Sequence, residues 1–114
     1  MLGYETFSQE QISETKINLR KKIFFLLLFV DPKTKDNYPN VDIKQAFYSL
    51  IHRISGLNTL LGEQQELVTV LSLLQEAINI YDTEDFEFST YRKLILDAGA
   101  EIMKLKEVSE DAKL

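Results

Sequence analysis

The sequence contains no cysteine, no tryptophan and only one histidine among its 114 residues. Without cysteine the chain can form neither disulfides nor thiolate zinc sites, and it has no thiol nucleophile. A single imidazole also excludes most metal sites that are built on histidine. These absences favour a function that depends on binding rather than on catalysis, and we expect no cofactor.

An excess of positive charge is also missing, because 13 Lys and Arg side chains stand against 18 Asp and Glu, for a net charge of −5. The charge is uneven: residues 1–35 carry a net +2, whereas residues 63–114 carry a net −7. Nucleic-acid binders usually cluster basic side chains with aromatic ones. The one basic run, Arg20 to Lys22, contains no interleaved aromatic platform, so we expect no nucleic-acid partner.

The main hydrophobic run, Ile23 to Val30, has eight residues. About 20 apolar residues are needed to cross a bilayer. Lys21 and Lys22 precede the run, but the Asp31 and Pro32 that follow are unlike the small-residue cleavage site of a secretory signal. We interpret the run as half of a helix that is buried on most sides, with at most peripheral membrane association. Contact with a membrane or partner, or pairing with a second copy, is the alternative.

The chain is rich in helical periodicity and shows no convincing strand alternation. We predict helices over residues 8–30, 42–55, 63–81 and 89–107, followed by a flexible tail over 108–114. The clearest apolar stripe is that of the second helix, formed by Ile43, Ala46, Phe47, Leu50, Ile51 and Ile54. Amphipathic helices with short connections predict one all-α domain over residues 1–114, an antiparallel up-down four-helix bundle.

Several helix ends carry recognisable signals. Ser8 and Gln11 match a capping box at the start of the first helix. Gly56 is suited to stop the second helix, with residues 57–62 as a short turn or an irregular helical stretch. Ser89 or Thr90 is expected to cap the fourth helix.

Two further features concern helix interiors and first turns. Gly99 lies in the middle of the fourth helix, where glycine costs about 1 kcal/mol relative to alanine. A close approach by a neighbouring helix would explain it. Glu63 and Glu66 are expected in the first turn of the third helix, where carboxylates favour the helix dipole.

No group of residues matches a catalytic or metal-binding pattern. His52 is the only imidazole, and we place it at the surface or at the edge of the core. The acidic residues Asp82, Glu84, Asp85 and Glu87 are dense, but they lack the spacing and the central glycine of a calcium loop. Glycine-rich phosphate loops and nucleophile-elbow motifs are absent from the sequence. We therefore expect a solvated acidic loop, no metal site and no enzyme.

Aromatic residues gather near the expected helix ends, namely Phe7, Tyr38, Phe86, Phe88 and Tyr91. Aromatic side chains at a rim often contact protein partners. Packing beneath loops is the other interpretation.

The order of the elements resembles a known family. Asp31 to Lys33, followed by Val41 to Ile43 at a helix start, is similar to the first loop of immunity proteins for pediocin-like (class IIa) bacteriocins, of the enterocin A immunity type. The segments Ile80 to Thr83 and Phe88 to Ile95 are similar to that family's short third loop and to the opening of its last helix. The resemblance covers about residues 12–106.

This resemblance implies an antiparallel four-helix bundle in the cytoplasm of a Gram-positive bacterium, without catalysis. It implies protection against a bacteriocin through the cytoplasmic side of its receptor, the mannose phosphotransferase permease. The C-terminal half of such proteins is tied to recognition, which implies partner contacts at Phe88, Tyr91, Arg92 and Lys93. The acidic character of this half disfavours direct contact with anionic lipid more than it disfavours receptor binding.

Other functions are open at this point. A general helical interaction or regulatory module, such as an adaptor or an inhibitor, fits the same composition and the same helices. A homodimer that pairs the apolar run at residues 23–30 is compatible with either function.

Overall fold

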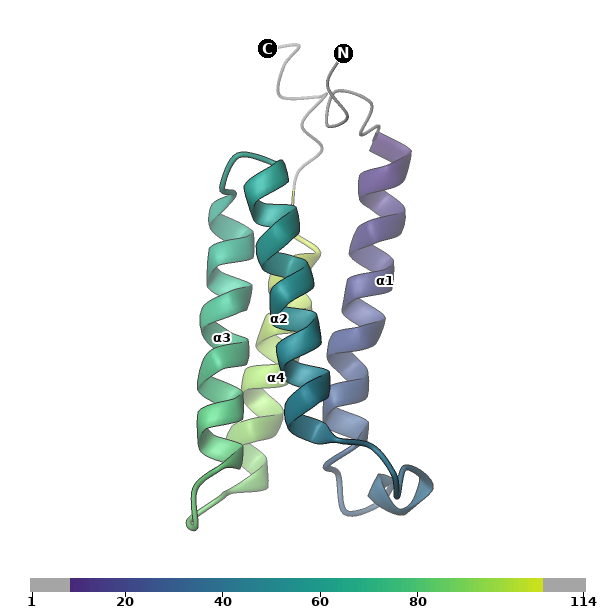
Figure 1. Cartoon of the computed structure of the whole chain (residues 1–114), viewed down its shortest axis with the longest axis vertical. Coiled ribbons are helices and arrows are strands. Elements are labelled where there is room, and N and C mark those ends of the chain that lie inside the picture. Colours follow the sequence, from purple (N-terminus) through teal and green to yellow (C-terminus); the bar gives the residue numbers. More distant parts are fainter. Residues whose placement is uncertain (1–8, 106–114) are drawn as a thin grey trace.

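The computed structural model describes residues 9–105, which form four helices and no strand. They are α1 (Gln9–Leu28), α2 (Ile43–Leu60), α3 (Gln65–Tyr81) and α4 (Phe88–Ile102), with a short 3-10 turn, η2 (Lys35–Asn37), between α1 and α2. The helices run alternately up and down, and the α1–α2 and α3–α4 connections lie at the same end (Figure 1). The predicted all-α antiparallel four-helix bundle is confirmed.

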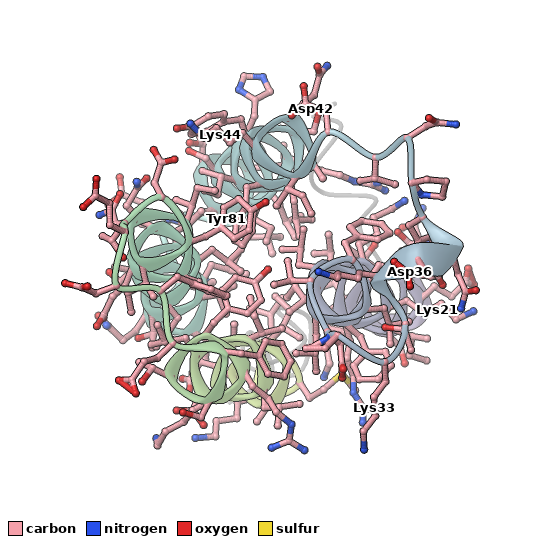
Figure 2. All side chains as sticks on the ribbon, turned by 90° about the horizontal axis from the view of Figure 1, so that it is seen from below. Lys21, Lys33, Asp36, Asp42, Lys44 and Tyr81 are labelled. Atoms are coloured by element: carbon pink, nitrogen blue, oxygen red, sulfur yellow. The ribbon has the colours of Figure 1, made fainter. Side chains whose placement is uncertain are left out.

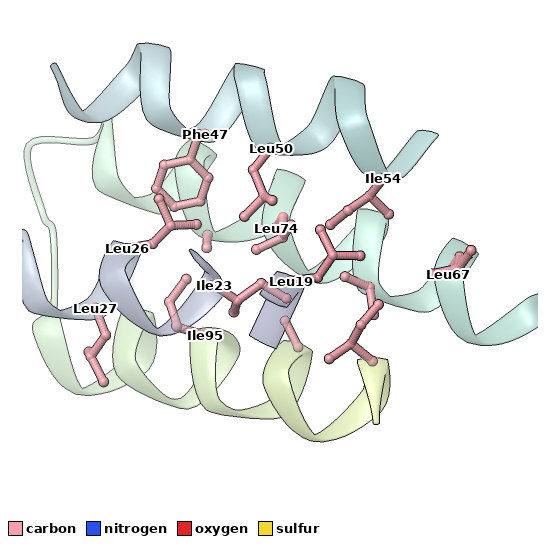
Figure 3. Packing of buried hydrophobic residues seen from close by; sticks show 14 of the residues in the cluster. Leu19, Ile23, Leu26, Leu27, Phe47, Leu50, Ile54, Leu67, Leu74 and Ile95 are labelled. Carbon is pink, nitrogen blue, oxygen red and sulfur yellow. The ribbon is translucent and has the colours of Figure 1, made fainter. Parts of the chain in front are cut away.

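The core is built from apolar side chains at helical spacing on all four helices. Figure 3 shows Phe47 and Leu50 of α2 facing Ile23 and Leu26 of α1. Each of these four side chains is at most 5% exposed. Burying a large apolar side chain stabilises a fold by roughly 1.5–3 kcal/mol, so the stripes read from the sequence account for the association of the helices.

Gly56 does not stop α2, because the helix continues through it to Leu60. The core-facing side of the helix continues as well, with Leu57 half-buried and the polar Asn58 buried. A glycine inside a helix costs about 1 kcal/mol, which the burial of one further turn outweighs. The expected stop at Gly56 is therefore wrong, and residues 57–60 are regular helix.

The turn between α2 and α3 is organised by Asn58, the one buried polar side chain among the described residues. Its Oδ1 accepts a hydrogen bond from the Gln64 amide at 2.7 Å, and its carbonyl oxygen accepts one from the Glu63 amide at 2.7 Å. Gly62 and Glu63 both have positive φ, 83° and 61° respectively. Glu63 therefore lies in the turn rather than in the first turn of α3, where only Glu66 remains.

The start of α4 differs from the expected cap. The residue before the helix is Glu87, whose side chain accepts no capping hydrogen bond, and Ser89 and Thr90 lie inside the first turn. Phe86 and Phe88 instead pack against Tyr91, with ring centroids 5.6 and 6.3 Å apart. Aromatic packing, rather than a hydroxyl cap, fixes the entry of the chain into α4.

Two helices end earlier in the sequence than predicted. The first helix ends at Leu28 rather than at residue 30, and α4 ends at Ile102 rather than at residue 107. Leu105 follows α4 in an irregular segment and is still buried. The proposed Ser8 cap and the tail at residues 108–114 lie outside the described residues.

Candidate partner-binding surface

Tyr91, expected to contact a partner, lies in the core with no exposed surface. Its hydroxyl donates a hydrogen bond of 2.6 Å to the carbonyl oxygen of Leu26 in α1. Burial raises the pKa of the Tyr91 phenol well above its ordinary value, and nearby Tyr81 adds to this effect. The interpretation of Tyr91 as a contact residue does not agree with this burial.

The other three expected contact residues lie at or near the surface. Phe88 is half-buried and stacks on Tyr91, while Arg92 and Lys93 are exposed. Lys93 forms an ion pair with Asp97 one turn later, with Nζ and Oδ2 2.9 Å apart. Arg92 takes part in none of the ion pairs formed by residues 9–105, so its exposed guanidinium is available to a partner.

Arg92 lies close to a groove between α1 and α4. Residues four apart are neighbours on a helix face, so Arg92 lies one turn before Leu96, which lines this groove. The groove has a volume of about 760 Å³. We call it the α1–α4 groove, and its walls include Ile17, Arg20, Lys21 and Phe24 of α1, Leu96, Gly99 and Ala100 of α4, and Met103 directly after α4.

The α1–α4 groove combines exposed apolar side chains with basic ones. Ile17 is 53% exposed, Phe24 48% and Leu96 38%. Arg20 and Lys21 are exposed beside them, and no acidic residue lines the groove. Exposed apolar side chains gathered at one place on a folded surface mark candidate interaction sites. The chemistry of this groove is therefore suited to binding an amphipathic, negatively charged surface.

Gly99 forms part of the groove but is not needed for close helix packing. A Cβ built on Gly99 would meet only the Cγ of Arg20, at 4.0 Å, which is ordinary van der Waals contact. The expected close approach by a neighbouring helix is wrong. The extended stem of Arg20 instead passes over the glycine, as long basic side chains often do over apolar surface.

A second, smaller hollow of about 280 Å³ lies on the other flank of α1, facing α2. Lys22, Phe25 and Arg53 contribute to it. Phe29 also lines this hollow; its ring stacks on Phe25 with the centroids 5.8 Å apart and meets Tyr38 edge-on at 5.0 Å. The basic and aromatic character of α1 is thus present on both flanks of the helix.

The apolar run at residues 23–30 is therefore only partly core. Ile23, Leu26 and Leu27 are buried, whereas Phe24 and Phe25 are 48% and 39% exposed. The expectation of burial on most sides holds for the three aliphatic residues and is wrong for the two phenylalanines. Within residues 9–105, no helix is both long enough and apolar enough to cross a membrane.

His52 and the acidic loop after α3 are the remaining candidates for a site. His52 is exposed on α2, and no three His, Asp or Glu side chains in the described part of the chain could hold a metal ion together. The acidic loop after α3 is solvated, and its Asp82 pairs with Lys44 across 2.8 Å. This pairing raises the pKa of Lys44 and links the start of α2 to the end of α3; Figure 2 shows Lys44 at that end of α2.

The sequence signal for the α1–α4 groove was present but weak. Ile17 and Leu96 fall outside the apolar stripes of their helices, so a pattern search for a core leaves them aside. Only the packing of α1 beside α4 brings these two residues, 79 positions apart in sequence, to one surface.

Comparison with known proteins adds no further assignment, because no family model, curated protein or solved structure matches this chain.

Proposed function

We propose that this protein is a non-catalytic immunity protein for a pediocin-like bacteriocin and that it acts by binding a protein partner. The partner is the receptor–bacteriocin complex, with the mannose phosphotransferase permease as receptor, approached from the cytoplasmic side of the membrane. Binding that is tighter to a closed state of the complex shifts its population away from the open pore.

The observation that carries the proposal is the corner between α3 and α4. The two stretches most similar to the immunity family, residues 80–83 and 88–95, meet at this corner. Tyr81 of the first stretch packs against Phe86 at 5.6 Å and against Tyr91 of the second at 6.2 Å. The resemblance therefore falls on residues that form one packed unit, rather than on scattered surface positions.

The same corner offers a route to a partner. Arg92 is exposed beside Phe88, and the α4 face that bears Arg92 continues into the α1–α4 groove. Arginine and aromatic side chains are enriched among residues that dominate binding energies at interfaces. A partner that contacts Arg92 and the exposed Leu96 one turn later on α4 would desolvate both side chains.

The test is a protection assay. A sensitive strain that expresses the chain is challenged with a panel of pediocin-like peptides, and survival is counted while immunoblotting verifies expression. We expect survival with at least one peptide. Arg92→Glu should reduce this protection by tenfold or more, since reversing a charge at an interface costs more than about 1.4 kcal/mol.

The matched control is Lys35→Glu, which reverses an exposed basic residue of η2, outside the corner and outside both hollows. It should protect as well as the unchanged chain. Unchanged killing across the whole panel, with expression verified, would contradict the proposal. If a pull-down with this chain recovers a soluble regulator and no permease subunits, the result would instead favour the general helical interaction module.

A further inference from the structure

The side of α1 that faces away from the core carries three of the seven large apolar side chains that are exposed in the described part of the chain. We define the α1 outward face as Ile17, Arg20, Lys21, Lys22, Phe24 and Phe25. Its three apolar members are 39–53% exposed. The exposed large apolar residues on the other helices are further apart: Tyr48 and Leu60 are three turns apart on α2, Val68 lies on α3 and Leu96 on α4.

The charge on this face is of one sign. Between Glu14 and Asp31 the chain contains no acidic residue, and Arg20, Lys21 and Lys22 are all exposed. None of the three takes part in an ion pair with residues 9–105. Figure 2, viewed along the bundle, shows Lys21 at the outer edge of the molecule on the side of α1 away from α3. The fold thus presents a basic face although the whole chain carries a net charge of −5.

The acidic residues of α4 leave this face positive. Asp97 is paired with Lys93, and Glu101 is paired with Lys104. Neither acid lines the α1–α4 groove, whose α4 wall is apolar. The acidic character of the C-terminal half therefore does not oppose an anionic surface placed against α1.

We propose that the α1 outward face binds the surface of an anionic lipid bilayer, with Phe24 and Phe25 entering the headgroup region. This inference goes beyond the proposed function and does not depend on it. Basic side chains that surround exposed aromatic ones are typical of surfaces that lie in the membrane interface. The lysine and arginine stems can lie along apolar surface while their charged ends reach lipid phosphates.

The distribution of residues over both flanks of α1 favours a flat surface over a helical protein partner. Ile17, Arg20 and Phe24 open toward α4, whereas Lys22 and Phe25 open toward α2. A partner helix seated in the α1–α4 groove would leave Lys22 and Phe25 uncovered. A bilayer surface that runs along α1 contacts both flanks at once. Because the axes of the four helices are roughly aligned, the bundle can lie with its long side on such a surface (Figure 1).

The absence of tryptophan gives the experiment a clean probe, because one introduced indole reports one position. The reporter is Phe24→Trp, and its matched control is Tyr48→Trp, on an exposed aromatic position of α2 that is 55% accessible. Each variant is mixed with vesicles of phosphatidylglycerol and phosphatidylcholine, or of phosphatidylcholine alone. Far-ultraviolet circular dichroism verifies that both variants keep the helical fold.

We expect a blue-shifted emission for Phe24→Trp with the anionic vesicles, a shift that is lost with phosphatidylcholine alone and lost at high salt. Tyr48→Trp should show no shift. In the Phe24→Trp background, Arg20→Gln with Lys21→Gln should weaken partitioning roughly 25-fold, because each basic side chain near an anionic surface contributes about fivefold. Ser72→Glu with Gln75→Glu on α3 changes the net charge equally and should leave partitioning unchanged.

Three results would overturn the inference. The first is an unshifted Phe24→Trp emission with anionic vesicles. The second is an equal shift at positions 24 and 48, which would mean non-specific adsorption. The third is a shift that appears only with a synthetic acidic amphipathic helix and not with vesicles, which would assign the face to a protein partner.

Discussion

The phenol oxygen of Tyr91 lies 2.6 Å from the carbonyl oxygen of Leu26, so the first turn of α4 completes the last turn of α1. The last carbonyls of a helix have no partner within the helix. In α1 the carbonyl of Phe25 accepts from the Phe29 amide and that of Leu28 from the Thr34 hydroxyl, at 2.9 and 2.7 Å. The carbonyl of Leu26 is satisfied from another helix.

The C-terminal end of α4 shows the reciprocal contact with α1. Lys16 of α1 donates from Nζ to the carbonyl oxygen of Leu105, just past the end of α4, at 2.8 Å. A positive charge is favourable near a helix C-terminus. Each of α1 and α4 therefore donates a hydrogen bond to a carbonyl oxygen at or just past the C-terminal end of the other. Apolar side chains pack between these two contacts.

Tyr91→Phe should destabilise the bundle by about 1–2 kcal/mol, because it leaves the buried carbonyl of Leu26 without its donor while keeping the ring. Urea unfolding followed by circular dichroism measures the change, with an unaltered denaturant slope. Tyr48→Phe, at an exposed position, is the control and should be neutral. A Tyr91→Phe variant as stable as the unchanged chain would show that the hydrogen bond contributes nothing net.

The pH dependence of stability provides a second test of the same phenol. Burial raises the pKa of Tyr91 in the folded chain, whereas in the unfolded chain it titrates near its ordinary value of about 10. Below about pH 10 both states keep the proton, and the stabilisation is complete. Above about pH 10 only the unfolded state loses it, so the free energy of unfolding falls by up to about 1.4 kcal/mol per pH unit.

Tyr91→Phe removes this contribution. The advantage of the unchanged chain over the variant should therefore be constant from pH 7 to 9 and should shrink at pH 11. Urea unfolding of both proteins at these pH values measures the difference, in which the remaining tyrosines and lysines cancel. Parallel curves up to pH 11 would mean that Tyr91 ionises equally in both states.

The helices were predictable from the sequence because each carries an apolar stripe that forms the core. Their ends were less predictable, because tertiary contacts decide them. Gly56 signals a stop on local grounds, yet α2 continues to Leu60, and Asn58, two residues after the glycine, is buried in the turn that joins α2 to α3. Ser89 and Thr90 are good caps on local grounds, yet α4 begins earlier in the sequence, at Phe88, whose ring packs on Tyr91.

The candidate site divides in the same way. Arg92 and Lys93 are exposed, as expected of contact residues, and Phe88 is half-buried. Tyr91 falls on the same apolar stripe as Ile95 and Ala98, so helical spacing alone favours its burial over the contact role implied by the resemblance. The α1–α4 groove could not be read from either helix alone, since its walls meet only after the chain has folded back three times.

Asn58→Ala should destabilise the protein by about 1–3 kcal/mol, because the Gln64 amide loses its acceptor in a partly buried turn. Thermal unfolding and urea unfolding measure this loss. Asn79→Ala, on the exposed side of α3, is the control and should stay within about 0.5 kcal/mol of the unchanged chain. Equal effects at positions 58 and 79 would contradict the role given to Asn58 in joining α2 to α3.

Gly62, in the same turn, has a φ of 83°, which L side chains rarely adopt. Gly62→Ala should therefore destabilise the bundle by roughly 1 kcal/mol, although its Cβ would meet no atom within 4 Å. The cost comes from the backbone alone. The sign of this effect should be opposite to that of the same substitution at Gly99 of α4.

Gly99→Ala should stabilise the bundle by about 0.5–1 kcal/mol, because alanine reduces the conformational freedom of the unfolded chain. The added Cβ reaches only ordinary contact with the Cγ of Arg20, at 4.0 Å, so the folded state has room for it. Urea unfolding of Gly99→Ala and Gly62→Ala should give shifts of opposite sign. A destabilised Gly99→Ala would mean that α1 and α4 approach more closely at this position, and that the stem of Arg20 cannot yield.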